Sequence, residues 1–180
     1  MASDSFDLID NEVSLIIVDS KKYLSTNIKI LYGFVNKKGC ACIYVTVNKS
    51  HLMLTNLFQR EKINQNKIFV IDASPATSKR EDDTGNVIFI NSPSALTDIS
   101  IATLSAIKSL SGGKKILFFD SISALLIYNE AGSVCKFAHF LINKLKEMNV
   151  TGVIIAVDKD LDEKIISQLT QFCDKSYKFQ

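Results

Sequence analysis

Short runs of apolar residues alternate along this chain with longer stretches in which apolar residues recur at helical spacing. Near-continuous apolar runs are typical of strands that are buried on both faces of a parallel sheet. A regular alternation of such strands with helices predicts an open α/β sheet with right-handed crossovers. We therefore expect a three-layer α/β sandwich with a mostly parallel central sheet.

The predicted elements cover most of the chain. The predicted strands are Leu15–Asp19, Ala41–Val47, Ile68–Asp72, Val87–Ile90, Ile116–Asp120, Val153–Val157 and Ser176–Phe179. The predicted helices are Thr26–Asn36, Ser50–Glu61, Thr97–Leu110, Ser133–Met148 and Asp162–Phe172. A chain of 180 residues fits one domain, which we expect to span residues 1–180. The polar, charged segment 74–86 interrupts the alternation, and we expect it to be an exposed loop.

Composition argues against several classes of protein. Hydrophobic residues make up 47% of the chain and charged residues 22%, which excludes a disordered chain. The 21 Lys and Arg residues against 19 Asp and Glu give a formal charge of +2, which is too balanced to predict binding to nucleic acid. No apolar run approaches the length of a membrane span, and the polar N-terminus does not read as a secretory signal. We expect a cytoplasmic protein without a membrane segment.

The four cysteines, Cys40, Cys42, Cys135 and Cys173, show neither a CxxC pair nor the spacing of a zinc site. In a reducing compartment such thiols behave as small apolar side chains. We therefore expect them in the core and predict no metal site.

Polar residues stand at or just after the predicted strand ends. In open α/β sheets, ligands bind at the carboxyl ends of the strands. The residues there are Asp19, Asn48, Asp72, Asn91, Asp120 and Asp158. Two interpretations stay open for Asp19, Asn48, Asp72 and Asp158, which either form an edge for interaction with a partner or cap the next helix and its turn.

Three segments resemble the RecA-type ATPases, and in particular their KaiC-like branch, which is common in archaea. Leu15–Gly39 (LIIVDSKKYLSTNIKILYGFVNKKG) resembles the first strand, phosphate loop and first helix of that family. Ala41–Ser50 (ACIYVTVNKS) resembles its second strand and catalytic turn, and Ile116–Tyr128 (ILFFDSISALLIY) its Walker B strand. The resemblance implies a P-loop NTPase-like core in which Asp120 stands where the family's acid holds magnesium.

The chain departs from the family in its phosphate loop. A phosphate loop, GxxxxGK[ST], needs glycines whose amides face phosphate oxygens and a lysine that neutralises charge. Asp19 and Leu24 occupy the two glycine positions here, and Ser25 occupies the lysine position. Only Thr26, at the hydroxyl position beside magnesium, is retained.

A second departure lies after the second strand, where the resemblance implies paired glutamates that polarise the attacking water. Asn48 and Lys49 stand there instead, and neither can act as that base. The loss of nucleotide binding follows from the phosphate loop, where each lost charge-assisted hydrogen bond costs about 1.5–3 kcal/mol. Losing the lysine and two or three amides of that loop would remove roughly 5 kcal/mol of binding free energy, which would weaken a micromolar ATP site to millimolar or worse. We therefore expect no ATPase activity, and no enzyme.

The leading hypothesis is a non-catalytic pseudo-ATPase that acts as a regulatory or protein-interaction module and needs no cofactor. Its expected partner is a protein, either a second copy of the chain or a related ATPase. The alternative is a degenerate nucleotide-binding protein that holds ATP or ADP through Thr26, Asp120 and Lys21 or Lys22 with little or no hydrolysis.

Two further hypotheses are weaker. A signalling receiver would use Asp72 as its phosphoacceptor and Lys159 as its lysine, but Asp19 stands without the second acid that such a domain needs. DNA binding would need a basic cluster and an aromatic stacking pattern, and the chain shows neither.

Overall fold

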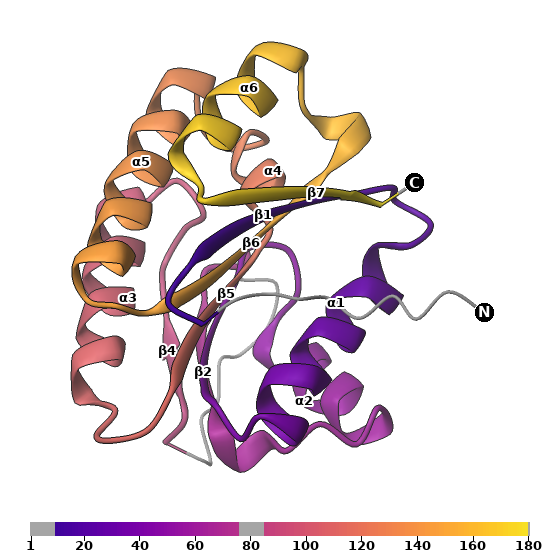
Figure 1. Cartoon of the computed structure of the whole chain (residues 1–180), viewed down its shortest axis with the longest axis vertical. Coiled ribbons are helices and arrows are strands. Elements are labelled where there is room, and N and C mark those ends of the chain that lie inside the picture. The colour runs from indigo at the N-terminus through magenta and orange to yellow at the C-terminus, as the bar shows by residue number, and fades with distance from the viewer. Residues whose placement is uncertain (1–9, 76–84, 180) are drawn as a thin grey trace.

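The computed structural model describes residues 10–75 and 85–179 of the chain (Figure 1). Its strands form one seven-stranded sheet in the order β4-β3-β2-β5-β6-β1-β7. Every neighbouring pair of strands in this sheet is parallel. The prediction of a mostly parallel central sheet is confirmed, and the described sheet is parallel throughout.

All the predicted strands are present, and each lies within two residues of its predicted bounds. They are β1 (Val13–Val18), β2 (Ala41–Thr46), β3 (Ile68–Asp72), β4 (Val87–Phe89), β5 (Lys115–Asp120), β6 (Thr151–Val157) and β7 (Lys175–Phe179). Strand β1 is buried along its whole length, and β2, β5 and β6 are buried except at one end residue, as expected for the interior of a sheet that is covered on both faces.

The predicted helices are also present. They are α1 (Tyr23–Tyr32), α2 (His51–Arg60), α3 (Leu96–Ser109), α5 (Ala131–Glu147) and α6 (Glu163–Phe172). The first of these begins at Tyr23 rather than at the predicted Thr26, and a π-helical stretch, η1 (Gly33–Lys37), continues it. Short 3-10 turns lie at η2 (Gln65–Lys67) and η3 (Asp158–Asp160). The prediction missed the four-residue helix α4 (Ile122–Leu125), which follows β5.

Helices cover both faces of the sheet, so the chain forms three layers (Figure 1). Helices α3, α5 and α6 pack in one apolar cluster, and α1 and α2 pack in a second cluster on the opposite face. Strand β5 contributes Leu117 and Phe119 to the first cluster and Ile116 and Phe118 to the second. Because alternate side chains of a strand point to opposite faces, Asp120 projects on the same face as Phe118, toward α1 and α2.

The predicted loop 74–86 lies largely outside the described residues, because 76–84 are not described. Ser74 is buried, whereas Pro75, Gly85 and Asn86 are exposed. The exposure of the loop as a whole therefore stays a prediction.

Candidate functional site

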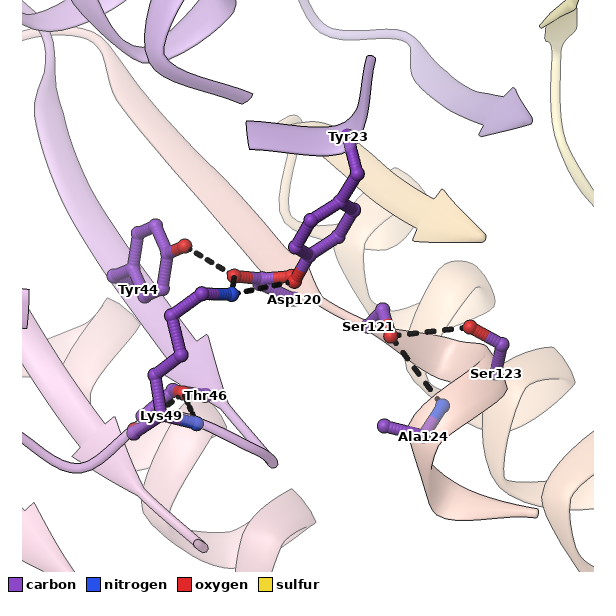
Figure 2. Close-up of polar contacts among 8 residues, drawn as sticks. All are labelled: Tyr23, Tyr44, Thr46, Lys49, Asp120, Ser121, Ser123 and Ala124. Carbon is purple, nitrogen blue, oxygen red and sulfur yellow. Dashed lines mark hydrogen bonds and ion pairs between the residues drawn. The ribbon is translucent and has the colours of Figure 1, made fainter. Parts of the chain in front are cut away.

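The carboxylate of Asp120, at the carboxyl end of β5, is the centre of a polar cluster of four side chains (Figure 2). Its Oδ1 accepts a hydrogen bond from the hydroxyl of Tyr23. Its Oδ2 accepts hydrogen bonds from the hydroxyl of Tyr44, at 2.5 Å, and from the ammonium of Lys49, at 3.2 Å. The Asp120 side chain is completely buried, so these groups take the place of water around its charge.

Tyr44 reaches Asp120 because β2 and β5 are neighbours in the sheet. Thr46 pairs with Asp120 in the register of the two strands, and Tyr44 stands two residues before Thr46 on the same face. The Tyr44 ring stacks on Phe118 at a centroid distance of 5.1 Å and meets Phe58 of α2 edge-on at 5.4 Å. Because these contacts hold the ring in place, its hydroxyl is directed toward Oδ2 of Asp120.

Lys49 lies in the turn between β2 and α2. The Thr46 hydroxyl accepts a hydrogen bond from the Lys49 amide at 3.2 Å and donates one to the Lys49 carbonyl at 2.7 Å, which anchors the lysine backbone. The ammonium then donates to the Tyr23 hydroxyl at 2.7 Å and lies 4.3 Å from the centre of the Tyr23 ring. Lys49 is therefore an ion-pair partner of Asp120 and a cation–π partner of Tyr23.

Tyr23 is the first residue of α1 and follows a tight turn. In this turn the Lys22 amide donates to the Asp19 carbonyl at 2.9 Å, and the Lys21 amide donates to the Asp19 carboxylate at 2.8 Å. The Thr26 amide bonds to the Lys22 carbonyl, which starts the helix. Because the helix starts this early, the Tyr23 side chain lies over the end of β5.

Both tyrosines of the cluster stay protonated at neutral pH. Burial raises the pKa of Tyr23 well above its usual value, and the charge of Asp120 and the hydrogen bond to it raise it further. Burial and the Asp120 charge also raise the pKa of Tyr44. Each hydroxyl is thus a neutral donor, and Lys49 supplies the positive charge of the cluster.

Asn27 lies one helical turn after Tyr23, and its side chain is 4% exposed. It is near enough to the Tyr23 hydroxyl to oppose the rise in the pKa of that residue. Within the described part of the chain, however, neither polar atom of its amide makes a well-formed hydrogen bond. The cluster is therefore flanked by an amide with unused hydrogen-bonding capacity.

Beyond Asp120 the chain turns at a cis peptide bond into α4. The hydroxyl of Ser121 accepts from the Ala124 amide at 3.3 Å and caps the helix (Figure 2). The hydroxyl of Ser123 accepts from the Val157 amide at 3.1 Å and ties α4 to the end of β6. The serines that follow Asp120 thus have structural contacts.

The predicted nucleotide-binding residues differ in their exposure. Thr26 and Asp120 are buried, but Lys21 and Lys22 are exposed on the turn before α1. Lys49, which the sequence offered only as the replacement of a lost glutamate, is the lysine that contacts Asp120.

The residues of the predicted interaction edge lie in different environments. Asp72 is buried and accepts hydrogen bonds from the Ser74 amide, the Ser74 hydroxyl and the His51 amide, so it caps the turn and the start of α2. Asp158 forms an ion pair with Lys178 at 3.0 Å. Asp19 is half-buried and holds the turn before α1, and Asn48 is exposed.

Sequence reasoning missed the roles of Tyr23 and Tyr44. The sequence indicated no role for Tyr23, and Tyr44 lies within an apolar strand. A signal for Tyr44 was available, since it stands two residues before the end of β2 on the face that also carries Thr46.

Across residues 10–75 and 85–179, no cluster of three or more His, Cys, Asp or Glu residues is placed to hold a metal ion. Cys40, Cys42 and Cys135 are buried free thiols, and Cys173 is half-buried. The same part of the chain contains no helix that is long and apolar enough to cross a membrane.

Comparisons with known proteins show what the chain as a whole is similar to. The model of a family of unknown function (DUF7504) matches residues 43–176. A KaiC-like protein from the hyperthermophilic archaeon Pyrococcus horikoshii OT3 superimposes with a TM-score of 0.66 at 15% identity, over 95% of this chain and 73% of that protein. The flagellar accessory protein FlaH from Methanocaldococcus jannaschii superimposes with a TM-score of 0.64 at 16% identity, over 94% of this chain and 71% of that protein. No curated protein matches the sequence.

At these identities the structural matches establish the fold alone. The fold is RecA-like, as the resemblance of the three segments implied.

Proposed function

This chain belongs to the family of unknown function DUF7504, and we propose that it is a non-catalytic RecA-like module that regulates or binds a protein partner. The partner we propose is a second copy of the chain or a related ATPase. The proposal includes the loss of nucleotide binding at the edge of the sheet where the RecA-type ATPases carry their active site.

The main support for the proposal is that donors from the chain itself make hydrogen bonds to both carboxylate oxygens of Asp120. An acid that holds magnesium for phosphoryl transfer must present lone pairs to the metal or its waters. Here Tyr23 donates to Oδ1, while Tyr44 and Lys49 donate to Oδ2. A metal could reach Oδ2 of the carboxylate only if the Lys49 ammonium moved away. The cluster therefore supports a site that does not bind magnesium-nucleotide.

The turn before α1 supports the same proposal. A phosphate loop presents several amides that no other group has bound. The amides of Lys21 and Lys22 both donate to Asp19, through its carboxylate and its carbonyl respectively. No residue of the turn 19–22 has a positive φ, and the carboxylate of Asp19 would repel a phosphate. These features favour the loss of the phosphate cradle.

Exposed apolar side chains support a protein partner. Leu24, Leu52, Met53, Ile127 and Tyr128 are between 41% and 75% exposed, and all follow the carboxyl ends of β1, β2 or β5. They flank the edge on which Asp19, Asn48, Asp72 and Asp158 were predicted to form an interaction surface. One structural neighbour is described as an accessory protein, and we extend that kind of role, though not its flagellar setting, to this chain.

The proposal is tested by calorimetric titration of ATP and ADP, each with Mg²⁺, into the purified chain up to low millimolar concentration. We expect no binding heat. Binding tighter than about 10 μM would contradict the proposal and favour the degenerate nucleotide-binding protein. The matched variant Asp120→Ala would then show whether that binding uses the carboxylate.

The partner is tested by sedimentation of the purified chain, alone and mixed with a RecA-like ATPase from the same cells. We expect a dimer or a mixed complex, and the variant Leu52→Asp/Met53→Asp should weaken it because it places charge on the apolar edge. A chain that stays monomeric and binds no such ATPase would contradict this part of the proposal.

A further inference from the structure

Asp120 places its carboxylate where solvent does not reach. Its side chain is 0% exposed, whereas the side chain of Lys49 is 19% exposed. The hydroxyls of Tyr23 and Tyr44 donate hydrogen bonds but bring no charge. Within the described residues, Lys49 forms the ion pair of Asp120, so the electrostatic balance of the cluster depends on this one ammonium.

The surroundings of that ammonium are those of a bound cation. Its nitrogen lies 3.2 Å from Asp120 Oδ2 and 2.7 Å from the Tyr23 hydroxyl oxygen. The face of the Tyr23 ring lies 4.3 Å away and contributes a cation–π contact. The side chain of Asn27 is buried beside the Tyr23 hydroxyl and adds a polar amide to these surroundings.

We propose that Asp120 and the Tyr23 hydroxyl form a cation site that the chain fills with the ammonium of its own Lys49, and that an external cation enters this site once Lys49 is removed. Carboxylate oxygens are ligands for hard metal cations, and carboxylate and hydroxyl oxygens also accept hydrogen bonds from ammonium ions. Truncation of the lysine to alanine would leave a buried carboxylate and, beside it, the space of the missing propylammonium group.

The inference rests on the proposed function and gives it a physical basis. A RecA-like site that carries its counter-charge on a side chain needs no metal or nucleotide to neutralise Asp120. The carboxyl edge of the sheet then keeps one conformation at any nucleotide concentration. A partner that docks on this edge would meet a constant surface rather than a nucleotide-dependent one.

The test is the response of Lys49→Ala to added cations, measured as the midpoint of thermal unfolding at constant ionic strength. The probes are n-propylammonium, which replaces the missing end of the lysine, and Mn²⁺. Choline is the control for a cation too large to enter. We expect the midpoint of Lys49→Ala to rise by about 3 °C or more with n-propylammonium or Mn²⁺ and to be unchanged with choline.

Matched variants separate a cation site from a general salt effect. Lys49→Arg keeps the charge and should not respond, and neither should the unmodified chain. The double variant Lys49→Ala/Asp120→Asn lacks the carboxylate and should also not respond. Mn²⁺ binding followed by electron paramagnetic resonance should be at least about tenfold tighter in Lys49→Ala than in the double variant, a difference of about 1.4 kcal/mol.

The proposal is overturned if Lys49→Ala responds to neither cation, or if the double variant responds equally. If Lys49→Ala does not fold in buffer, the proposal requires that it refold with n-propylammonium or Mn²⁺, and failure to do so while the double variant folds also overturns it. No nucleotide is present in these measurements. If the nucleotide titration contradicts the proposed function, that result is therefore distinguishable from a failure of the cation site.

Discussion

Asp72 and Asp120 are two buried aspartates at the ends of β3 and β5, the strands on either side of β2, yet they have different partners. Asp72 accepts hydrogen bonds from Ser74, two residues away, and from the amide of His51 at the start of α2. Asp120 accepts from Lys49, Tyr44 and Tyr23, which lie 71, 76 and 97 residues away. One carboxylate stabilises local turns, and the other joins β2, the turn after β2, α1 and β5.

The difference shows that a strand-end acid has no fixed role. The partners of Asp72 are mostly backbone amides, which any sequence supplies, so its hydrogen bonds say little about function. The partners of Asp120 are side chains of particular types, and one of them carries the opposite charge. Functional inference is therefore stronger for Asp120, and the predictions below test this contrast.

The largest effect is expected for Lys49→Met, which removes the ammonium but keeps an apolar side chain of similar length. A buried carboxylate left without its counter-charge destabilises a fold by about 3–5 kcal/mol. We expect about 3 kcal/mol here, because Lys49 is 19% exposed and water can partly replace it. Urea denaturation measures the change in unfolding free energy, and a loss below about 1 kcal/mol would show that the ion pair contributes little.

A smaller loss is expected for Tyr44→Phe, which removes one donor to Asp120 and leaves the ring stacked on Phe118. Hydrogen bonds to charged groups contribute about 1.5–3 kcal/mol. The matched control is Tyr32→Phe, at a side chain that is 39% exposed, where a change within about 0.5 kcal/mol is expected. Equal effects of the two substitutions in urea denaturation would contradict the role given to Tyr44.

Asp72→Asn should cost less, about 1 kcal/mol, because asparagine caps turns and helix starts nearly as well as aspartate does. Its effect should also be independent of the Asp120 cluster. The double variant Asp72→Asn/Tyr44→Phe should lose the sum of the two single losses within about 0.5 kcal/mol, as measured by urea denaturation. A larger departure from the sum would show that the two carboxylates are coupled.

The smallest effect is expected far from the cluster, at Asp174. Burial raises the pKa of this carboxyl, but the hydrogen bond from Lys146 and the Val13 amide outweigh it, and the pKa lies below its usual value of 3.8. The stability that Asp174 contributes is therefore present above about pH 4 and is lost as the pH falls through the lowered pKa. Thermal melts between pH 7 and pH 2 should show a slightly smaller acid-induced loss in Asp174→Asn than in the unmodified chain. An identical profile would contradict the assignment.

Most of the fold could be predicted because its signal is local. The apolar runs of β1 to β6 and the apolar stripe of α5 are visible without knowledge of their neighbours. Helix α4 was missed because four residues are too short to show a helical period. The start of α1 was placed too late because the turn from Asp19 to Lys22 closes through one backbone hydrogen bond and one to the Asp19 carboxylate, and it contains no glycine or proline.

The site was predicted only in part, for a physical reason. Asp120 could be singled out because it ends an apolar strand, and the caps made by Asp72 follow from a local rule. The contacts of Tyr23, Tyr44 and Lys49 depend on β2 lying beside β5 and on α1 starting at Tyr23. Strand order and helix starts are decided by packing over the whole chain, so residue types alone could not bring these side chains together.

A double-mutant cycle between Lys49 and Asp120 tests the central claim most directly. The unfolding free energies of Lys49→Met, Asp120→Asn and the double variant are compared with that of the unmodified chain. We predict a coupling energy of about 2 kcal/mol or more, with the double variant at least as stable as Lys49→Met, because removal of both charges leaves none buried alone. Losses that add within about 0.5 kcal/mol would show that Lys49 does not neutralise Asp120 and would contradict the account.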